Sequence, residues 1–344
     1  MALEIPSLRI GLIGFSQQQQ DALHESLNED TATRQAWEFA PAQEADALWI
    51  NGARTQLLPE GLLRVASGIP SGRSTQLDPS SLNRPAAYAA PLPRAFQPDI
   101  VFNLDPGSVA GVLRKFEQLL RPQIAQFCLA SQILEQESAL GSGVYRVERP
   151  RDGALIAVVD LRGDVGVFTS ASAVDFDNAM WTALAQRTPD QIPAHFFRCS
   201  LSRLMWEYAL RTTRDVLPRR YRSDMLYFRR PPRLPQRLLQ DSHLLLLREL
   251  ATAPGTMPEL QDRTGIEASR IAADLGALYL VGAITSNPKR AAPIASLPSE
   301  EEIGSSTHSV MPASRHDDSH LPPILRQRGS RSDRTAPAPL QLDQ

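Results

Sequence analysis

Several residue types that usually define a class of protein are scarce in this sequence. Of its 344 residues only two are cysteines, Cys128 and Cys199, which are too few for a disulfide framework. We therefore expect two buried free thiols in a reducing compartment. No apolar run approaches the roughly 18 residues that span a bilayer, and the N-terminus lacks the basic and apolar regions of a secretory signal. These absences predict a cytoplasmic protein without a membrane span.

Motifs of the common catalytic and cofactor sites are also missing. The six histidines are scattered, and there is no His-Glu-x-x-His, no paired-cysteine metal motif and no Gly-x-Ser-x-Gly elbow. Gly11 and Gly14 lie three positions apart in an apolar segment, but the third glycine of the dinucleotide-binding fingerprint is absent. Asp175 and Asp177 have the positions of a helix cap and a first-turn acid. We expect a protein that is not an enzyme and that uses no cofactor or metal.

Short apolar segments at regular intervals mark the first part of the chain as an α/β domain. Residues 17–27 have the pattern of a helix, and a second helix begins at Pro106 with Asp105 as its N-cap. Strands that alternate with helices favour an open, doubly wound parallel sheet that is covered on both faces. The expected strands are residues 8–15, 37–40, 45–51, 86–90 and 99–104.

Residues 8–120 resemble the receiver domain of bacterial response regulators in the order of their strands and in the turn at 100–106. A working receiver needs an acidic pair after strand one to hold a divalent cation. It also needs a phosphoacceptor aspartate that ends strand three and a lysine on the last strand. Here these places are taken by Gly14–Gln17, Asn51 and Asn103. The resemblance implies a degenerate receiver that cannot be phosphorylated and that serves as a docking domain.

A middle domain with a different pattern follows the receiver-like domain. Asp-Gly and Gly-Asp turns separate three apolar segments, which predicts an antiparallel meander. Two helices are expected after it, the second capped by Ser200. The predicted strands are residues 144–147, 154–160 and 165–169, and the predicted helices are residues 175–186 and 200–212.

An arginine-rich segment at the end of the middle domain is the main candidate site. From Arg198 to Arg237 there are eleven arginines and only three acids, with aromatic residues between them. Guanidinium groups and aromatic rings together bind phosphates and stack on bases. Alternatively, the arginines brace a domain interface through ion pairs with Glu207, Asp215 and Asp224. The candidate polyanion-binding residues are Arg211, Arg214, Arg219, Arg220, Arg222, Arg229, Arg230 and Arg233.

Residues 239–287 resemble winged-helix and helix-turn-helix modules. Three short helices are expected, the second capped by Thr256, with a tight glycine turn between the second and the third. The third helix offers Ser269 and Arg270 to a nucleic acid, but acids flank this arginine, so protein docking is the favoured role. Residues 288–344 are rich in Ser, Pro and charged residues, which predicts a disordered tail.

These features predict a bacterial signalling protein. It would be a response-regulator-like adaptor, independent of phosphorylation, that docks a protein partner. One alternative is a DNA-binding transcriptional regulator that uses the helix-turn-helix and the arginines. The other is a cyclic-dinucleotide receptor, because the run Arg229–Arg233 is similar to the arginine cluster of PilZ-type receptors. The expected parts are a receiver-like domain at 1–122, the middle domain at 123–238, the winged-helix-like module at 239–287 and the tail at 288–344.

Overall fold

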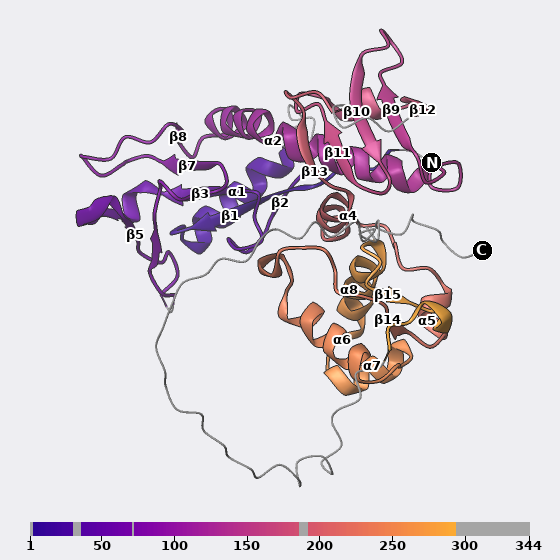
Figure 1. The fold of residues 1–344 in the computed structure, drawn as a ribbon. Helices are drawn as coiled ribbons and strands as arrows, with labels where there is room; N and C mark the ends of the chain where they lie inside the picture. The colour runs from indigo at the N-terminus through magenta and orange to yellow at the C-terminus, as the bar shows by residue number, and fades with distance from the viewer. Residues whose placement is uncertain (1–2, 30–35, 71, 186–191, 294–344) are drawn as a thin grey trace, which may run out of the picture. The chain divides into compact units, whose positions relative to one another are not determined.

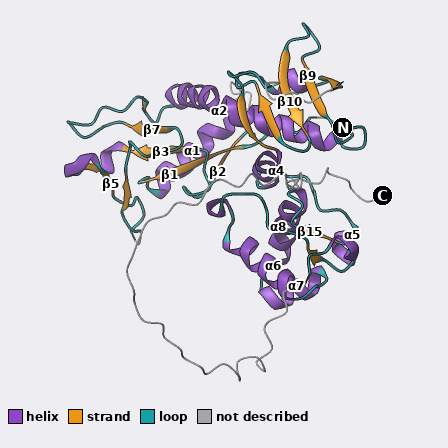
Figure 2. Ribbon diagram, in the orientation of Figure 1, coloured by secondary structure: helices purple, strands orange, loops and turns teal. Residues whose placement is uncertain are grey.

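The computed structural model divides into two compact units, one within Met1–Val216 and one within Leu217–Ala338 (Figure 1). Both units contain helices and strands, which confirms the mixed α/β class (Figure 2). In the part of the chain that is described, none of the helices combines the length and apolar character needed to cross a bilayer. The described residues are 3–29, 36–70, 72–185 and 192–293, so the predicted disorder of the tail lies outside them beyond residue 293.

A five-stranded parallel sheet opens the first unit, as the apolar segments predict. The strands are β1 (Leu8–Ile13), β2 (Trp37–Phe39), β3 (Ala47–Asn51), β7 (Ala86–Ala89) and β8 (Val101–Phe102). Their order in the sheet is β2-β1-β3-β7-β8. In the register of β1 and β3, Ile10 lies opposite Ala47 and Leu12 opposite Trp49. All five residues of β3 are buried, because this central strand is covered on both faces.

Helices α1 (Gln17–Glu29) and α2 (Pro106–Glu135) pack against one face of this sheet. The ring of His24 in α1 lies 4.2 Å from the ring of Phe39, which in turn lies 5.9 Å from the indole of Trp49. α2 contacts β8 at the edge of the same sheet. Large aromatic side chains on alternate strand positions therefore form this half of the core.

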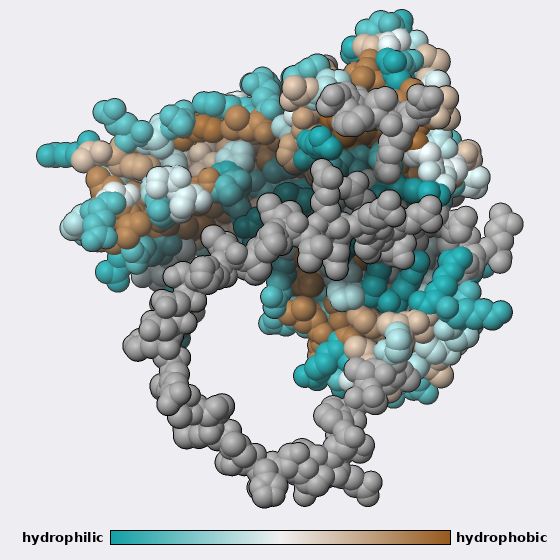
Figure 3. Space-filling model, viewed as in Figure 1, coloured by the Kyte–Doolittle hydropathy of each residue, from teal (hydrophilic) through white to brown (hydrophobic). Residues whose placement is uncertain are grey.

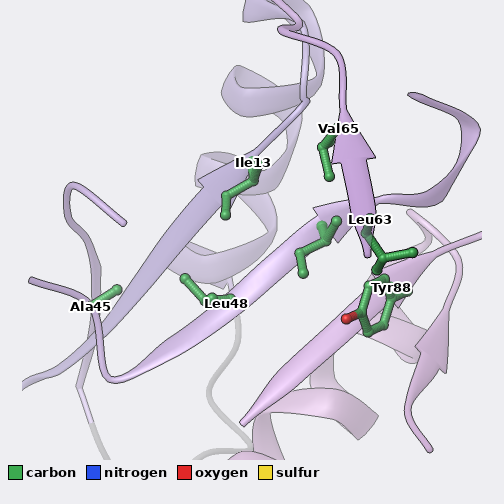
Figure 4. Packing of buried hydrophobic residues seen from close by; sticks show 7 residues of the cluster. Ile13, Ala45, Leu48, Leu63, Val65 and Tyr88 are labelled. Carbon is green, nitrogen blue, oxygen red and sulfur yellow. The ribbon is translucent and has the colours of Figure 1, made fainter. Parts of the chain in front are cut away.

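The opposite face of the sheet is covered by a small antiparallel sheet instead of helices. Figure 4 shows Leu63 of this small sheet beside Tyr88 of the large one, and Val65 and Leu48 belong to the same buried cluster. The doubly wound arrangement is therefore wrong for this face. The small strands were missed because each is only three residues long and alternation over three residues is a weak signal. They are β4 (Thr55–Leu57), β5 (Leu63–Val65) and β6 (Thr75–Leu77); the 3₁₀ turn η1 (Gly52–Arg54) leads from β3 into β4, and η2 (Pro59–Gly61) joins β4 to β5.

α2 is one continuous helix of 30 residues that contacts both five-stranded sheets of the first unit. The Asp105 carboxylate accepts a hydrogen bond from the amide of Ser108 at 3.0 Å, which confirms the predicted N-cap. The predicted domain boundary at residue 122 lies inside this helix, at Pro122. α2 contacts β8 of the first sheet and elements of the second, so the chain does not divide there.

A second, antiparallel sheet completes the first unit and confirms the predicted meander. Its order is β12-β9-β10-β11-β13. α4 (Leu201–Ala209) follows the last strand, and the Ser200 hydroxyl caps it by accepting a hydrogen bond from the Arg203 amide at 3.2 Å. The strands are β9 (Val144–Glu148), β10 (Leu155–Asp160), β11 (Asp164–Val167), β12 (Met180–Leu184) and β13 (Phe197–Ser200).

The helix predicted at residues 175–186 is wrong. Ser172 and Asp175 do form a capping box, but the helix that they start, α3, contains only Ala173–Phe176. Asn178 then adopts a left-handed conformation with φ of 58°. The following residues form β12, which pairs with β9. The helix therefore starts before the cap predicted at Asp175, and pairing with a distant strand decided the structure beyond Phe176.

Three helices in the predicted order form the second unit, together with a two-stranded sheet. The Thr256 amide donates to the Glu259 carboxylate at 2.8 Å in a capping box, and Gly265 ends the second helix with φ of 67°. The arginine-rich segment belongs to this unit from residue 217 onward, because β14 lies in it and pairs with β15. The elements are α5 (Arg220–Ser223), β14 (Tyr227–Phe228), η3 (Gln236–Leu238), α6 (Asp241–Thr252), α7 (Met257–Thr264), α8 (Ala268–Leu280), β15 (Ile284–Thr285) and η4 (Pro288–Arg290).

Candidate functional site

The carboxyl edge of the parallel sheet is closed by an amide network around Asn51. The Asn51 side chain is 3% exposed, and its NH₂ group donates to the Gly14 carbonyl at 3.1 Å and to the Gln19 side-chain oxygen at 3.2 Å. Its own oxygen accepts a hydrogen bond from the Ala53 amide at 3.1 Å. The Gln19 oxygen also accepts from the amide of Ser16 at 3.0 Å. Each polar atom of the Asn51 amide is therefore satisfied inside the protein.

The small antiparallel sheet packs against the same edge of the parallel sheet through Val65. Gly14 has φ of 82°, and a Cβ placed there would come within 2.6 Å of a methyl group of Val65. Asn103 lies outside this network: its side chain is exposed, and its backbone amide donates to the Ser108 hydroxyl at 2.9 Å. Amides neither accept a phosphoryl group nor provide the carboxylates that a divalent cation prefers. Within the described residues, no cluster of three or more His, Cys, Asp or Glu side chains could hold a metal ion.

Of the predicted polyanion-binding arginines, Arg211 and Arg214 belong to the first unit, where both are ion-paired. Arg211 pairs with Asp46, whose carboxylate also accepts a hydrogen bond from the Arg9 amide at 3.0 Å. Arg214 contacts Glu4 at 3.3 Å and Glu135 at 3.0 Å. These acids are not the predicted partners.

Glu4 is the centre of a second internal network in the first unit. Its carboxylate accepts hydrogen bonds from the Tyr208 hydroxyl at 2.6 Å and from the Thr212 hydroxyl at 2.8 Å. Burial and the hydrogen bond to Glu4 raise the pKa of Tyr208 to about 12. Glu207, which sequence reasoning paired with the candidate arginines, lies 3.8 Å from Arg203 instead. The positive charge of Arg214 therefore compensates buried acids, and the N-terminal segment is tied to the end of α4.

Three further candidate arginines lie at α5 in the second unit. Arg219 and Arg222 are exposed, and the guanidinium of Arg220 lies 5.6 Å from the ring centre of Tyr221. The Tyr221 ring is buried and contacts the ring of Tyr279 in α8, at 4.8 Å. Tyr221 thus attaches α5 to the end of α8, and hydrophilic residues gather on the α5 side of this unit in Figure 3.

Arg229, Arg230 and Arg233 follow β14 and form a group of like charges. The Arg230 Nε donates to the Gly282 carbonyl at 3.3 Å. A Cβ placed at Gly282 would lie 3.1 Å from a terminal nitrogen of Arg230 and 3.7 Å from one of Arg229. Burial lowers the pKa of Arg230, and the charges of Arg229 and Arg233 lower it further. The structure therefore separates the predicted arginine-rich segment into an ion-paired part, a part at α5 and a convergent part after β14.

The helix-turn-helix candidates lie on the first turns of α8. Ser269 is exposed, and Arg270 donates to the Gln240 side chain at 2.7 Å and lies 3.6 Å from Asp274. All residues from Asp274 to Leu280 are buried. A recognition helix needs an exposed face with several free polar groups, whereas α8 exposes little more than its first turn.

Sequence reasoning missed a buried pair between His243 and Asp274 in the second unit. The Nδ1 of His243 accepts a hydrogen bond from the Gln240 amide at 3.1 Å, so Nε2 holds the proton and faces Asp274 at 3.2 Å. His243 is completely buried. The pair joins α6 to α8, and a lone histidine in a sequence has no signal that identifies such a partner.

Acid is expected to destabilise the second unit through Asp274. Burial opposes ionisation of this carboxyl, but hydrogen bonds from His243 and Ser242 hold its pKa below the usual value. The stabilisation is complete above the unfolded pKa of about 3.9 and is lost as the pH falls through the lower folded pKa. Urea denaturation from about pH 7 to about pH 3 should show a loss of stability that is smaller in Asp274→Asn. An identical pH dependence in both proteins would contradict this role.

A small hollow between α2 and α4 is another candidate pocket in the first unit. It has a volume of about 240 Å³, with Phe127, Leu204 and Tyr208 among the residues that line it. Arg203 and Glu207 also line it and lie within ion-pair distance of one another. The hollow is smaller than most ligand pockets, which begin near 300 Å³. Arg211 lines it as well, but this arginine is paired with Asp46.

The two cysteines are buried free thiols, as the sequence predicts. Burial raises the pKa of both Cys128 and Cys199 to about 12. Thiols in this state are poor nucleophiles because the thiolate is scarce at neutral pH.

Comparisons of the chain with protein-family models, with curated proteins and with solved structures find no match.

Proposed function

We propose that this chain is a non-enzymatic regulatory protein whose first unit is a receiver-like adaptor domain that docks a protein partner without phosphorylation. The order of the five parallel strands supports this proposal. Numbered along the chain within that sheet, they lie in the order 2-1-3-4-5. This is the order of the flavodoxin-like doubly wound domains, of which bacterial receivers are one group.

The amide network at Asn51 is the observation that most favours an adaptor over a phosphorylated switch. Doubly wound domains hold their ligands outside the carboxyl ends of the strands. At this position the side chain of Asn51 donates to Gly14 and Gln19, and Val65 closes the space beside Gly14. A carboxylate, a cation and a phosphoryl group have no place there without disruption of these contacts.

Strand β8 offers the docking surface in this proposal. β8 is the last strand in the order of the sheet, and Val101 and Leu104 beside it are 47% and 40% exposed. The carbonyls of Ile100 and Phe102 accept hydrogen bonds from β7, so the backbone groups of Val101 point away from the sheet. An extended segment of a partner can add a strand here and cover the two apolar side chains.

The adaptor proposal predicts that charge at β8 abolishes partner binding. The full chain and the variant Val101→Asp/Leu104→Asp should be compared as baits in a lysate of the source cells. The control is Ile69→Asp, which alters an apolar residue that is 44% exposed in another loop. We expect a protein that the wild type and the control retain and that the β8 variant loses, because an edge charge opposes strand addition. If the β8 variant still retained that protein, β8 would not be the docking surface.

Phosphorylation is tested separately on the same protein. Incubation with Mg²⁺ and acetyl phosphate should leave the intact mass of the chain unchanged, because Asn51 has no carboxylate to phosphorylate. A phosphoryl adduct on the first unit would overturn the proposed mode of action even if a partner binds.

The alternative of a DNA-binding helix-turn-helix has less support. Arg270 is engaged with Gln240 and Asp274, and α8 is buried from Asp274 onward. The helices of the second unit fit a packing or protein-docking role better, because few of their polar side chains are available to base edges.

A further inference from the structure

We propose that Arg229 and Arg230 form a binding site for a phosphate group at the carboxyl end of α8. The phosphate belongs to a free nucleotide or to the backbone of a nucleic acid. This inference goes beyond the adaptor function, because it concerns the second unit and a different class of ligand.

Convergence of two guanidinium groups is the first argument. Terminal nitrogens of Arg230 and Arg229 lie 3.1 Å and 3.7 Å from the point where a Cβ of residue 282 would stand. Gly282 has φ of 67°, which favours glycine at this position. Without a side chain at this position, the two guanidinium groups approach the same point of the backbone.

The backbone brings further positive charge to the same place. The amide of Ala292 donates to the carbonyl of Phe228 at 2.9 Å, which places the segment after η4 beside the end of β14. η4 contains Lys289 and Arg290, both exposed. The chain that contains these cations thus returns to the residue before Arg229, although some 60 residues separate them in the sequence.

The positive charges of Arg229 and Arg230 are only partly compensated inside the protein. Within the described residues, neither Arg229 nor Arg230 forms an ion pair with a carboxylate. The carboxyl end of α8 supplies about half a negative charge, against two full positive charges. Burial and the neighbouring arginines lower the pKa of Arg230, but arginine remains protonated in proteins. The ligand-free site therefore holds a repulsion that a bound anion relieves.

Phosphate is the anion that suits this arrangement best. Each guanidinium is a planar fork of N–H donors, and two forks can bind several oxygens of one tetrahedral group. A phosphate monoester has close to two negative charges at neutral pH, which matches two arginines. A carboxylate and the phosphodiester of a nucleic-acid backbone each carry only one negative charge, so the charge match favours the phosphate monoester of a free nucleotide over the backbone.

The test compares the full chain with two matched variants, Arg229→Gln and Arg237→Gln. Both remove one positive charge from the second unit, but Arg237 is exposed in η3. Inorganic phosphate should raise the melting temperature of the wild type and of Arg237→Gln over chloride at equal ionic strength, by mass action. Arg229→Gln should lose this response. In phosphate-free buffer it should melt no lower than the wild type, because its change removes a repulsion.

Two further probes distinguish the source of the phosphate. Adenosine monophosphate and a fluorescein-labelled single-stranded oligonucleotide are titrated into the same three proteins. We expect at least one of them to bind the wild type about tenfold more tightly than Arg229→Gln, with a salt slope for the oligonucleotide that is smaller by about one in the variant. Binding of the nucleotide identifies a small-molecule site, and binding of the oligonucleotide alone identifies a nucleic-acid contact.

Several results would overturn the proposal. An equal loss in Arg237→Gln would show diffuse attraction between charges and no built site. A lower melting temperature of Arg229→Gln without phosphate would show that the arginine only supports the fold. A response to inorganic phosphate without binding of either probe would mean an adventitious ion only.

Discussion

Replacement of Arg211 by alanine is expected to lower the free energy of unfolding by about 3–5 kcal/mol. The reason is the partner that remains: the Asp46 side chain is 2% exposed and would keep a buried charge without its cation. Asp46 also accepts a hydrogen bond from the Arg9 amide, so its movement would disturb the pairing of β1 and β3. Urea denaturation at neutral pH measures the effect as a lower midpoint at constant slope.

Two controls separate this ion pair from a general effect of arginine removal. Arg203→Ala should change stability by less than about 1 kcal/mol, because its contact with Glu207 is long and exposed. In the double variant Arg211→Ala/Asp46→Ala, part of the lost stability should return, since no buried charge is left. If Arg211→Ala were as mild as Arg203→Ala, Arg211 would be available to a ligand, as the charge pattern of the sequence suggests.

Replacement of Asn51 by aspartate should cost about 3 kcal/mol. The substitution keeps the size of the side chain but removes both N–H donors, so the carboxylate would face the Gly14 carbonyl and the Gln19 oxygen. A buried acceptor that loses its donor costs about 1–3 kcal/mol, and more where a charge is involved. Thermal and urea denaturation of Asn51→Asp against the wild type measure the loss.

Asn103→Asp is the matched control for this change. Asn103 is exposed, so the same chemical substitution should alter the stability by no more than about 0.5 kcal/mol. Mg²⁺ should not rescue Asn51→Asp, because residues 14–17, which follow β1 beside Asn51, contain no carboxylate to share the cation. A rise in melting temperature with Mg²⁺ would show that the edge can open into a receiver-like cation site, against the adaptor proposal.

Local signals along the chain predicted the helix starts well. Asp105 with Pro106, Ser200 and Thr256 each cap the helix that the sequence assigns to them. A cap acts within one turn, through a side chain and an amide three residues further on, so sequence neighbours contain all the necessary information. The end of a helix depends on the rest of the fold, as α3 shows: Asp175, the predicted cap, lies inside its first turn behind the N-cap Ser172, and the helix stops at Phe176, before β12 pairs with β9.

The candidate site was predicted less well, because a count of charges does not identify their partners. The eight candidate arginines form one arginine-rich segment in the sequence. In the structure, however, Arg211 and Arg214 are paired with acids far away in the chain. Glu4, for example, lies 3.3 Å from Arg214, which is 210 positions further along the chain (214 − 4). Arg229 and Arg230 converge only because β14 pairs with β15 and so lies beside Gly282.

The sequence by itself determined the mixed α/β class, the parallel strands with their buried apolar segments, the helix caps and the absence of carboxylates at the ends of the first and third strands. Each of these depends on residue type and on spacing within a few positions. Only the tertiary structure decided that a small antiparallel sheet covers one face, that α2 joins two sheets and which arginines are ion-paired. Those features depend on contacts between distant segments, and their energies come from burial and charge pairing that exist only after the chain has folded.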